Sequence, residues 1–236
     1  MKRHESFVNR IFKSKYLKAL IIGLLVFAFL VYGGYDRWRK SRVLDYRADR
    51  DYAFVHVNKE PITLGDVAYL IMFEEKRTEE QARVYNPRSP KDYWNTSDKG
   101  KILSIRVRNT ILDMAVHDKI MYDLAIKDGV TLDEKDEKAL KNTISDFWDD
   151  LYEGQEENCY VSKKVINEEI RKAAIVAKYQ MKLAKEAKVN DVRFNYEGEE
   201  YQKILKKYKV KVDKSFWRRV RVGEVTLDHD RVNYVQ

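Results

Sequence analysis

The sequence predicts a mainly α-helical protein, in which an N-terminal transmembrane helix precedes a helical domain with one or two very short β-strands. The first observation is an uncharged apolar run over residues 19–35. The second is a series of long segments whose apolar residues recur every three or four positions, as on one face of a helix. The third is that strand-like alternation is confined to short stretches such as residues 53–57 and 210–212.

Composition limits the kinds of site that the chain can hold. With 44% hydrophobic residues in a length of 236, it can build a packed core. A single cysteine, Cys159, excludes an intramolecular disulfide and a cysteine-rich zinc site. The four histidines are scattered without metal-ligand spacing. We therefore expect no metal and no other cofactor, and we identify no catalytic residues.

The net charge of +8 is concentrated at the N-terminus. Residues 1–50 hold twelve of the 46 basic residues and four of the 38 acidic residues, so the rest of the chain carries 34 of each. A nucleic-acid-binding domain needs a basic footprint of its own. The neutral body favours no nucleic-acid partner, although residues 201–221 form a local basic stretch.

Residues 19–35 read ALIIGLLVFAFLVYGGY. As a helix they extend about 25 Å, against about 30 Å for the bilayer core. Lys18 and Arg37 flank the run and can snorkel to make up the difference. Bulky and charged residues follow the run where a signal peptidase would need small ones, so the segment is predicted to be an uncleaved anchor in contact with the lipid bilayer.

Six basic residues flank each side of the run, so the positive-inside rule does not decide the orientation. The short basic N-terminal segment favours a cytoplasmic N-terminus and a body in the periplasm or extracytoplasmic space, anchored to the cell (inner) membrane by a single pass. The predicted divisions are a cytoplasmic basic segment at 1–18, the transmembrane helix at 19–35, a stalk at 36–52 that continues the helix, a helical domain at 53–213 and a C-terminal tail at 214–236.

The body begins with the predicted strand at 53–57 and a turn at Asn58-Lys59. Thr63 and Asp66 form a capping pattern that opens a helix. Its apolar face comprises Leu64, Val67, Ala68 and Ile71.

Residues 84–97 hold two of the three prolines and are predicted to be a loop. A long helix then runs from about Asp98 to a glycine cap at Gly129. Its apolar side comprises Ile105, Leu112, Val116, Ile120 and Leu124, supported by Met121 and Ala125.

Three further helices complete the predicted body. One is opened by a capping box at Thr131–Glu134 and ends near Leu151, and a short one covers about 197–208. Between them, Ser162 caps a long helix whose predicted inner face comprises Ile166, Ile170, Ala173, Ala174, Ala177, Met181 and Ala184. Residues 210–212 and 225–227 are the predicted C-terminal strands.

This order of elements resembles the chaperone domain of the SurA/PrsA foldases, in the trigger-factor/SurA peptide-binding superfamily. The resemblance is carried by the turn and strand at Val55–Thr63, the helix end at Ala125–Val130, the cap at Thr131–Glu134, the long helix over Tyr160–Glu186 and the closing strand at Lys207–Val212. It covers about residues 53–213. One departure is Asn58-Lys59 where the family usually has Asn-Gly.

The larger departure is the missing parvulin domain, because only 24 residues follow Val212. The resemblance therefore implies a membrane-anchored chaperone or foldase-like protein that binds unfolded or assembling exported polypeptides, rather than an enzyme. One alternative is a dedicated assembly or scaffold subunit of a membrane complex. A second, by family kinship, is a peptidyl-prolyl cis-trans isomerase.

Aromatic side chains are the candidates for client binding, because they offer large contact areas on binding surfaces. For each residue taken singly, filling the core of the body is the favoured role, but as a group we expect at least one to line an apolar groove if the body binds unfolded chains. The candidates are Tyr93, Trp94, Phe147, Trp148, Tyr152, Phe216 and Trp217.

Overall fold

A computed structural model describes residues 15–40, 43–98, 100–229 and 232. The chain divides into two compact units, Met1–Leu44 and Asp45–Gln236. The fold is mainly α with a small three-stranded antiparallel sheet, which confirms the predicted class at that level. Most of the predicted cytoplasmic segment 1–18 and the end of the predicted tail lie outside the described residues.

The first unit contains helix α2, Lys15–Lys40. Its apolar side chains are exposed along residues 19–35, for example Leu25 and Phe29. Among the described residues, no helix combines the length and the apolarity needed to cross a membrane.

The predicted stalk is not one continuous helix. α2 ends at Lys40, and residues 43–52 form bends and turns instead. Asp45 opens the second unit, and its carboxylate accepts hydrogen bonds from the backbone N–H groups of Arg47 and Ala48 at 3.1 and 3.0 Å. An aspartate that bonds the backbone two and three residues ahead favours a turn over a helix interior.

The sheet has the order β2-β1-β5, formed by Ala53–Val57 (β1), Glu60–Thr63 (β2) and Val210–Val212 (β5). The predicted strands at 53–57 and 210–212 are confirmed, and so is the turn, where Asn58 has φ of 57°. β2 was not predicted. The predicted strand at 225–227 is wrong, since these residues form bends on α3.

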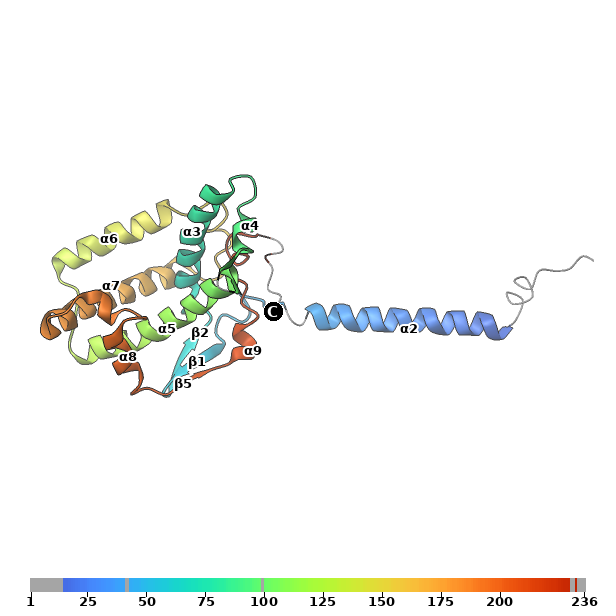
Figure 1. Cartoon of the computed structure of the whole chain (residues 1–236), viewed down its shortest axis with the longest axis horizontal. Coiled ribbons are helices and arrows are strands. Elements are labelled where there is room, and N and C mark those ends of the chain that lie inside the picture. The colour runs from blue at the N-terminus through green and yellow to red at the C-terminus, as the bar shows by residue number, and fades with distance from the viewer. Residues whose placement is uncertain (1–14, 41–42, 99, 230–231, 233–236) are drawn as a thin grey trace, which may run out of the picture. The chain divides into compact units, whose positions relative to one another are not determined.

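Three long helices make the framework of the body: α3 (Ala68–Tyr85), α5 (Leu103–Lys127) and α7 (Lys163–Ala187). Figure 1 shows α5 and α7 side by side, with the sheet below α5. The predicted capping pair precedes α3, with the Thr63 N–H donating to Asp66 Oδ2 at 2.7 Å. The predicted α5 face is largely confirmed, with Val116, Ile120 and Ala125 buried.

Shorter elements connect this framework. The predicted loop contains helix α4 (Lys91–Trp94). A hairpin of β3 (Ser97–Asp98) and β4 (Lys101–Ile102) follows it, so α5 begins at Leu103 rather than near Asp98 as predicted. After α7 come η1 (Asp191–Phe194), α8 (Glu199–Leu205), β5 and α9 (Lys214–Trp217). The predicted tail from residue 214 onward thus belongs to the same compact unit as the helices.

Two details of the later helices differ from the prediction. Helix α6, Glu134–Asp149, is capped by Asp133 with Asp136 rather than by Thr131 with Glu134. On α7, capped by Ser162 as predicted, Met181 is 57% exposed and Ala177 is exposed too, while Ile175, Val176 and Tyr179 are buried. Both α5 and η1 pack on α7. The buried surface of α7 is therefore wider than one apolar stripe, and it does not include Met181.

Candidate binding cleft

Four elements of the second unit enclose a cleft of about 210 Å³. β2 and the first turns of α3 form one side, and α5 and α7 form the other. The cleft is lined by Pro61, Ile62, Asp66, Tyr69, Leu70, Ala115, Asp118, Lys119, Tyr122, Glu169, Lys172 and Ala173. A volume of this size accommodates one or two side chains of a bound polypeptide.

Two tyrosine rings stand in the walls of the cleft. Tyr69 contacts Phe147 of α6 edge-on, with 5.3 Å between ring centroids, and lies 5.9 Å from Phe73. Burial raises the pKa of Tyr69 to about 12, with smaller contributions from nearby carboxylates. Tyr122 comes from α5, and the Lys172 ammonium lies 6.0 Å from its ring centroid. Aromatic walls of this kind offer contact area to apolar or cationic side chains.

The charged groups of the cleft are engaged with partners. Lys172 donates to Glu169 at 2.7 Å, Lys119 donates to Asp123 at 3.0 Å, and Asp118 lies 2.7 Å from His117. Burial raises the pKa of Glu169. The hydrogen bond and the positive charge of Lys172 act in the opposite direction but do not cancel this rise. Burial acts to lower the pKa of Lys172, but the hydrogen bond to Glu169 and the charges of Glu169 and Asp66 together outweigh it, so the pKa is raised. The cleft therefore combines apolar walls with locally balanced charge.

The structure separates the seven predicted aromatic residues. Trp94, Phe147, Phe216 and Trp217 are buried. Trp217 stacks on Phe54 with ring centroids 4.7 Å apart, and Phe216 stacks on Tyr52 at 4.2 Å. These four side chains fill the core, which is the role that the sequence favours for each of them singly. Phe147 still supports the cleft indirectly, through its contact with Tyr69.

The other three predicted aromatic residues are half-buried. The Tyr93 hydroxyl donates to Gln81 at 3.1 Å, and the Trp148 indole N–H donates to Asn167 at 2.8 Å. The Arg83 guanidinium lies 4.2 Å from the Tyr152 ring centroid. None of the seven lines the cleft.

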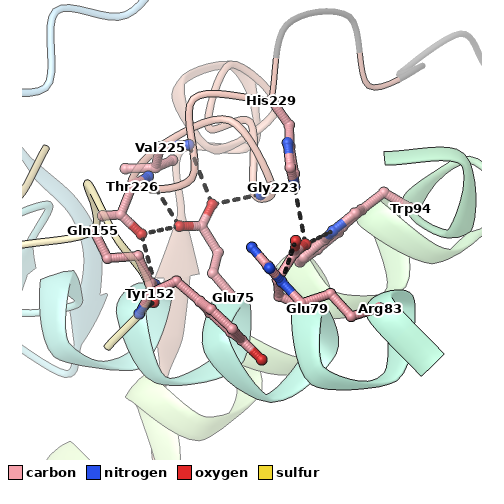
Figure 2. Close-up of polar contacts among 10 residues, drawn as sticks. All are labelled: Glu75, Glu79, Arg83, Trp94, Tyr152, Gln155, Gly223, Val225, Thr226 and His229. Carbon is pink, nitrogen blue, oxygen red and sulfur yellow. Dashed lines mark hydrogen bonds and ion pairs between the residues drawn. The ribbon is translucent and has the colours of Figure 1, made fainter. Parts of the chain in front are cut away.

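A second polar cluster lies on another face of α3 (Figure 2). The fully buried carboxylate of Glu75 accepts hydrogen bonds from the backbone N–H groups of Gly223, Val225 and Thr226, the last two at 3.1 and 2.9 Å, and from the Thr226 hydroxyl. Burial raises the pKa of Glu75, and these hydrogen bonds oppose the rise. The carboxylate fixes the C-terminal segment to α3.

Glu79 lies one turn further along the same helix. Its Oε2 accepts from the Trp94 indole N–H at 3.1 Å and lies 2.9 Å from His229 Nε2. Its Oε1 finds no hydrogen-bond donor within the described part of the chain, but Arg83 Nε lies 3.3 Å away, so the contact is ionic. Burial acts to raise the pKa of Glu79, but His229, Trp94 and Arg83 together lower it below its usual value.

The lowered pKa of Glu79 predicts a pH-dependent contribution to stability. A carboxyl whose pKa is lower in the folded state stabilises the fold above its unfolded pKa and loses this effect as pH falls. We expect Glu79→Gln to lower Tm most near neutral pH, and the difference from wild type to shrink below about pH 4. Thermal scans from acid to neutral pH test this, with the exposed Glu80→Gln on the same helix as control. A difference that grows on acidification would contradict the assignment.

Sequence reasoning missed Tyr69, Tyr122, Glu75 and Glu79. A signal for the two glutamates was present, since they continue the stripe of Ile71 at four-residue spacing and so fall on the buried face of α3. Nothing in the sequence marks the two tyrosines, because the cleft depends on how α3, α5 and α7 meet.

Comparisons of this chain with protein-family models, curated proteins and solved structures find no match. The resemblance to SurA/PrsA chaperones therefore rests on the sequence motifs and stays a prediction. Within the residues described, no group of three or more His, Cys, Asp or Glu side chains could hold a metal ion.

Proposed function

We propose that this chain is a membrane-anchored, extracytoplasmic chaperone-like protein that binds unfolded or assembling exported polypeptides. The observation that carries the proposal is the cleft between β2, α3, α5 and α7, with Tyr69 and Tyr122 in its walls. A half-enclosed site with aromatic walls and balanced charge suits segments of varied sequence, because apolar contact is not directional.

The anchor is the second part of the proposal. Residues 19–35 contact the bilayer, which is supported by their uncharged sequence and by the exposed apolar side chains of α2, such as Leu25 and Phe29. An anchor would hold the binding unit where exported chains emerge and so raise its effective concentration there. Protease accessibility of the body in spheroplasts tests this location.

The cleft is tested by Tyr122→Ala in the full chain, reconstituted in nanodiscs. The probe is fluorescently labelled, reduced and carboxymethylated α-lactalbumin, which is permanently unfolded. Since the substitution removes an aromatic wall, we expect the Kd from fluorescence anisotropy to rise about tenfold. Tyr196→Ala serves as control, because Tyr196 is also half-buried and does not line the cleft. A wild-type chain that binds no probe would overturn the function, and an unaffected Tyr122→Ala variant would overturn the site.

A photo-crosslinking amino acid at residue 122 separates the proposal from its alternatives. Many substoichiometric crosslinks from cell envelopes support a general chaperone, whereas one stoichiometric partner supports a dedicated assembly subunit. A proline-peptide isomerisation assay tests the enzymatic alternative. Acceleration that a point substitution in residues 45–236 abolishes would establish an isomerase.

A further inference from the structure

The two edges of the small sheet differ in their free backbone groups. In an antiparallel pair, successive residues direct their N–H and C=O groups alternately toward the partner and away from it. The Asn58 N–H donates to Lys209 O, and the Asp213 N–H donates to Phe54 O, both at 2.7 Å. Residues 209, 211 and 213 therefore face β1, and the backbone groups of Val210 and Val212 point to the outer side of β5.

The outer edge of β2 offers no free backbone N–H group. By the same alternation, Pro61 and Thr63 direct their backbones outward from β2. Pro61 has no N–H, and the Thr63 N–H is already bonded to Asp66 at 2.7 Å. By contrast, no hydrogen bond joins the outward groups of Val210 or Val212 to any other described residue. An open edge of this kind is a template for a further strand.

The charge around β5 indicates which strand would pair there. Five exposed lysines cluster on and beside it, and none forms an ion pair with another described residue: Lys206, Lys207, Lys209, Lys211 and Lys214. Lysines on an edge strand repel a second copy of the same edge. The same charges attract an extended segment that carries carboxylates.

We propose that the outer edge of β5 binds an extended, acidic polypeptide segment as a fourth strand of the sheet. Main-chain hydrogen bonds to Val210 and Val212 supply the pairing, and the lysine cluster supplies the preference for carboxylates. This inference rests on the proposed function for the presence of a polypeptide client, and it adds a second contact that is separate from the cleft and selects the client by charge.

The test uses the full chain in nanodiscs of zwitterionic lipid and a labelled peptide, Thr-Glu-Val-Glu-Val-Glu-Thr. A second peptide carries N-methyl groups on two adjacent central amides. Because successive N–H groups of an extended strand point to opposite sides, this pair blocks hydrogen bonding at both edges. A third carries the same two groups on its terminal amides. We expect central methylation to weaken binding about tenfold, terminal methylation to change it little, and a peptide with Lys in place of Glu to bind at least tenfold more weakly.

Two protein variants test the same edge from the other side. Val212→Pro removes an outward N–H and leaves the bonds of residues 211 and 213 to β1 in place. Lys209→Glu with Lys211→Glu reverses the local charge, and Lys141→Glu with Lys185→Glu makes the same change at exposed positions on α6 and α7. We expect about tenfold weaker peptide binding for the first two and wild-type binding for the control pair. Circular dichroism confirms that each variant is folded.

Equal binding of the parent and centrally methylated peptides would overturn the inference. So would a shift of the full chain to a dimer that Val212→Pro abolishes, because a second copy would then be the occupant. If the acidic peptide does not bind while unfolded α-lactalbumin still binds in a Tyr122-dependent manner, the edge site fails and the proposed function stands. If neither probe binds, both fail.

Discussion

Replacing Ile120 by Asp is expected to lower the free energy of unfolding by about 3–5 kcal/mol. Ile120 is completely buried in the middle of α5, beside the equally buried Met121. The substitution removes a core side chain and introduces a carboxylate that has no water and no prepared partner. Both effects destabilise the folded state, so the variant should unfold at much lower urea concentration.

Ile126→Asp on the same helix is the matched control, because Ile126 is 50% exposed. Its carboxylate stays hydrated, and we expect a change of at most about 1 kcal/mol. Urea denaturation followed by circular dichroism measures both variants against wild type. Equal stability of the Ile120→Asp and Ile126→Asp variants would show that the inner face of α5 is assigned wrongly.

Sequence reasoning succeeded where neighbouring residues determine the structure. The Ser162 cap and the turn at Asn58 are made by residues within a few positions of each other, and both are present. The Thr63–Asp66 hydrogen bonds are present too, but they lie in the turn before α3, whose N-cap residue is Val67. The apolar face of α5 was also predicted, because a single repeated spacing describes the side that the core covers. These are local rules, and tertiary contacts did not override them here.

Predictions failed where distant segments determine the structure. Residues 225–227 alternate like a strand, but the N–H groups of Val225 and Thr226 bond to Glu75, about 150 positions earlier in the chain. Met181 fits an apolar stripe, but α5 and η1 cover a different side of α7. The cleft was missed for the same reason, since its lining comes from four elements whose packing no local pattern describes.

Glu75→Gln should be the most damaging isosteric change in the body. The carboxylate accepts four hydrogen bonds: Gly223 and Val225 donate to Oε1, and the Thr226 N–H and hydroxyl donate to Oε2. An amide has one acceptor oxygen, so its NH₂ group must face at least one backbone N–H. Because the site is fully buried, no water can separate the two donors.

We therefore expect Glu75→Gln to cost about 2–4 kcal/mol of unfolding free energy and to loosen the segment 222–229 before the rest of the body. Hydrogen exchange locates the effect, since the amides of Gly223, Val225 and Thr226 should exchange much faster while those in the middle of α5 stay protected. Glu80→Gln, exposed on the same helix, should leave both measurements near wild type. Uniform acceleration across the body would mean that Glu75 stabilises the whole core, and unchanged exchange at Thr226 would mean that the carboxylate does not hold the C-terminal segment.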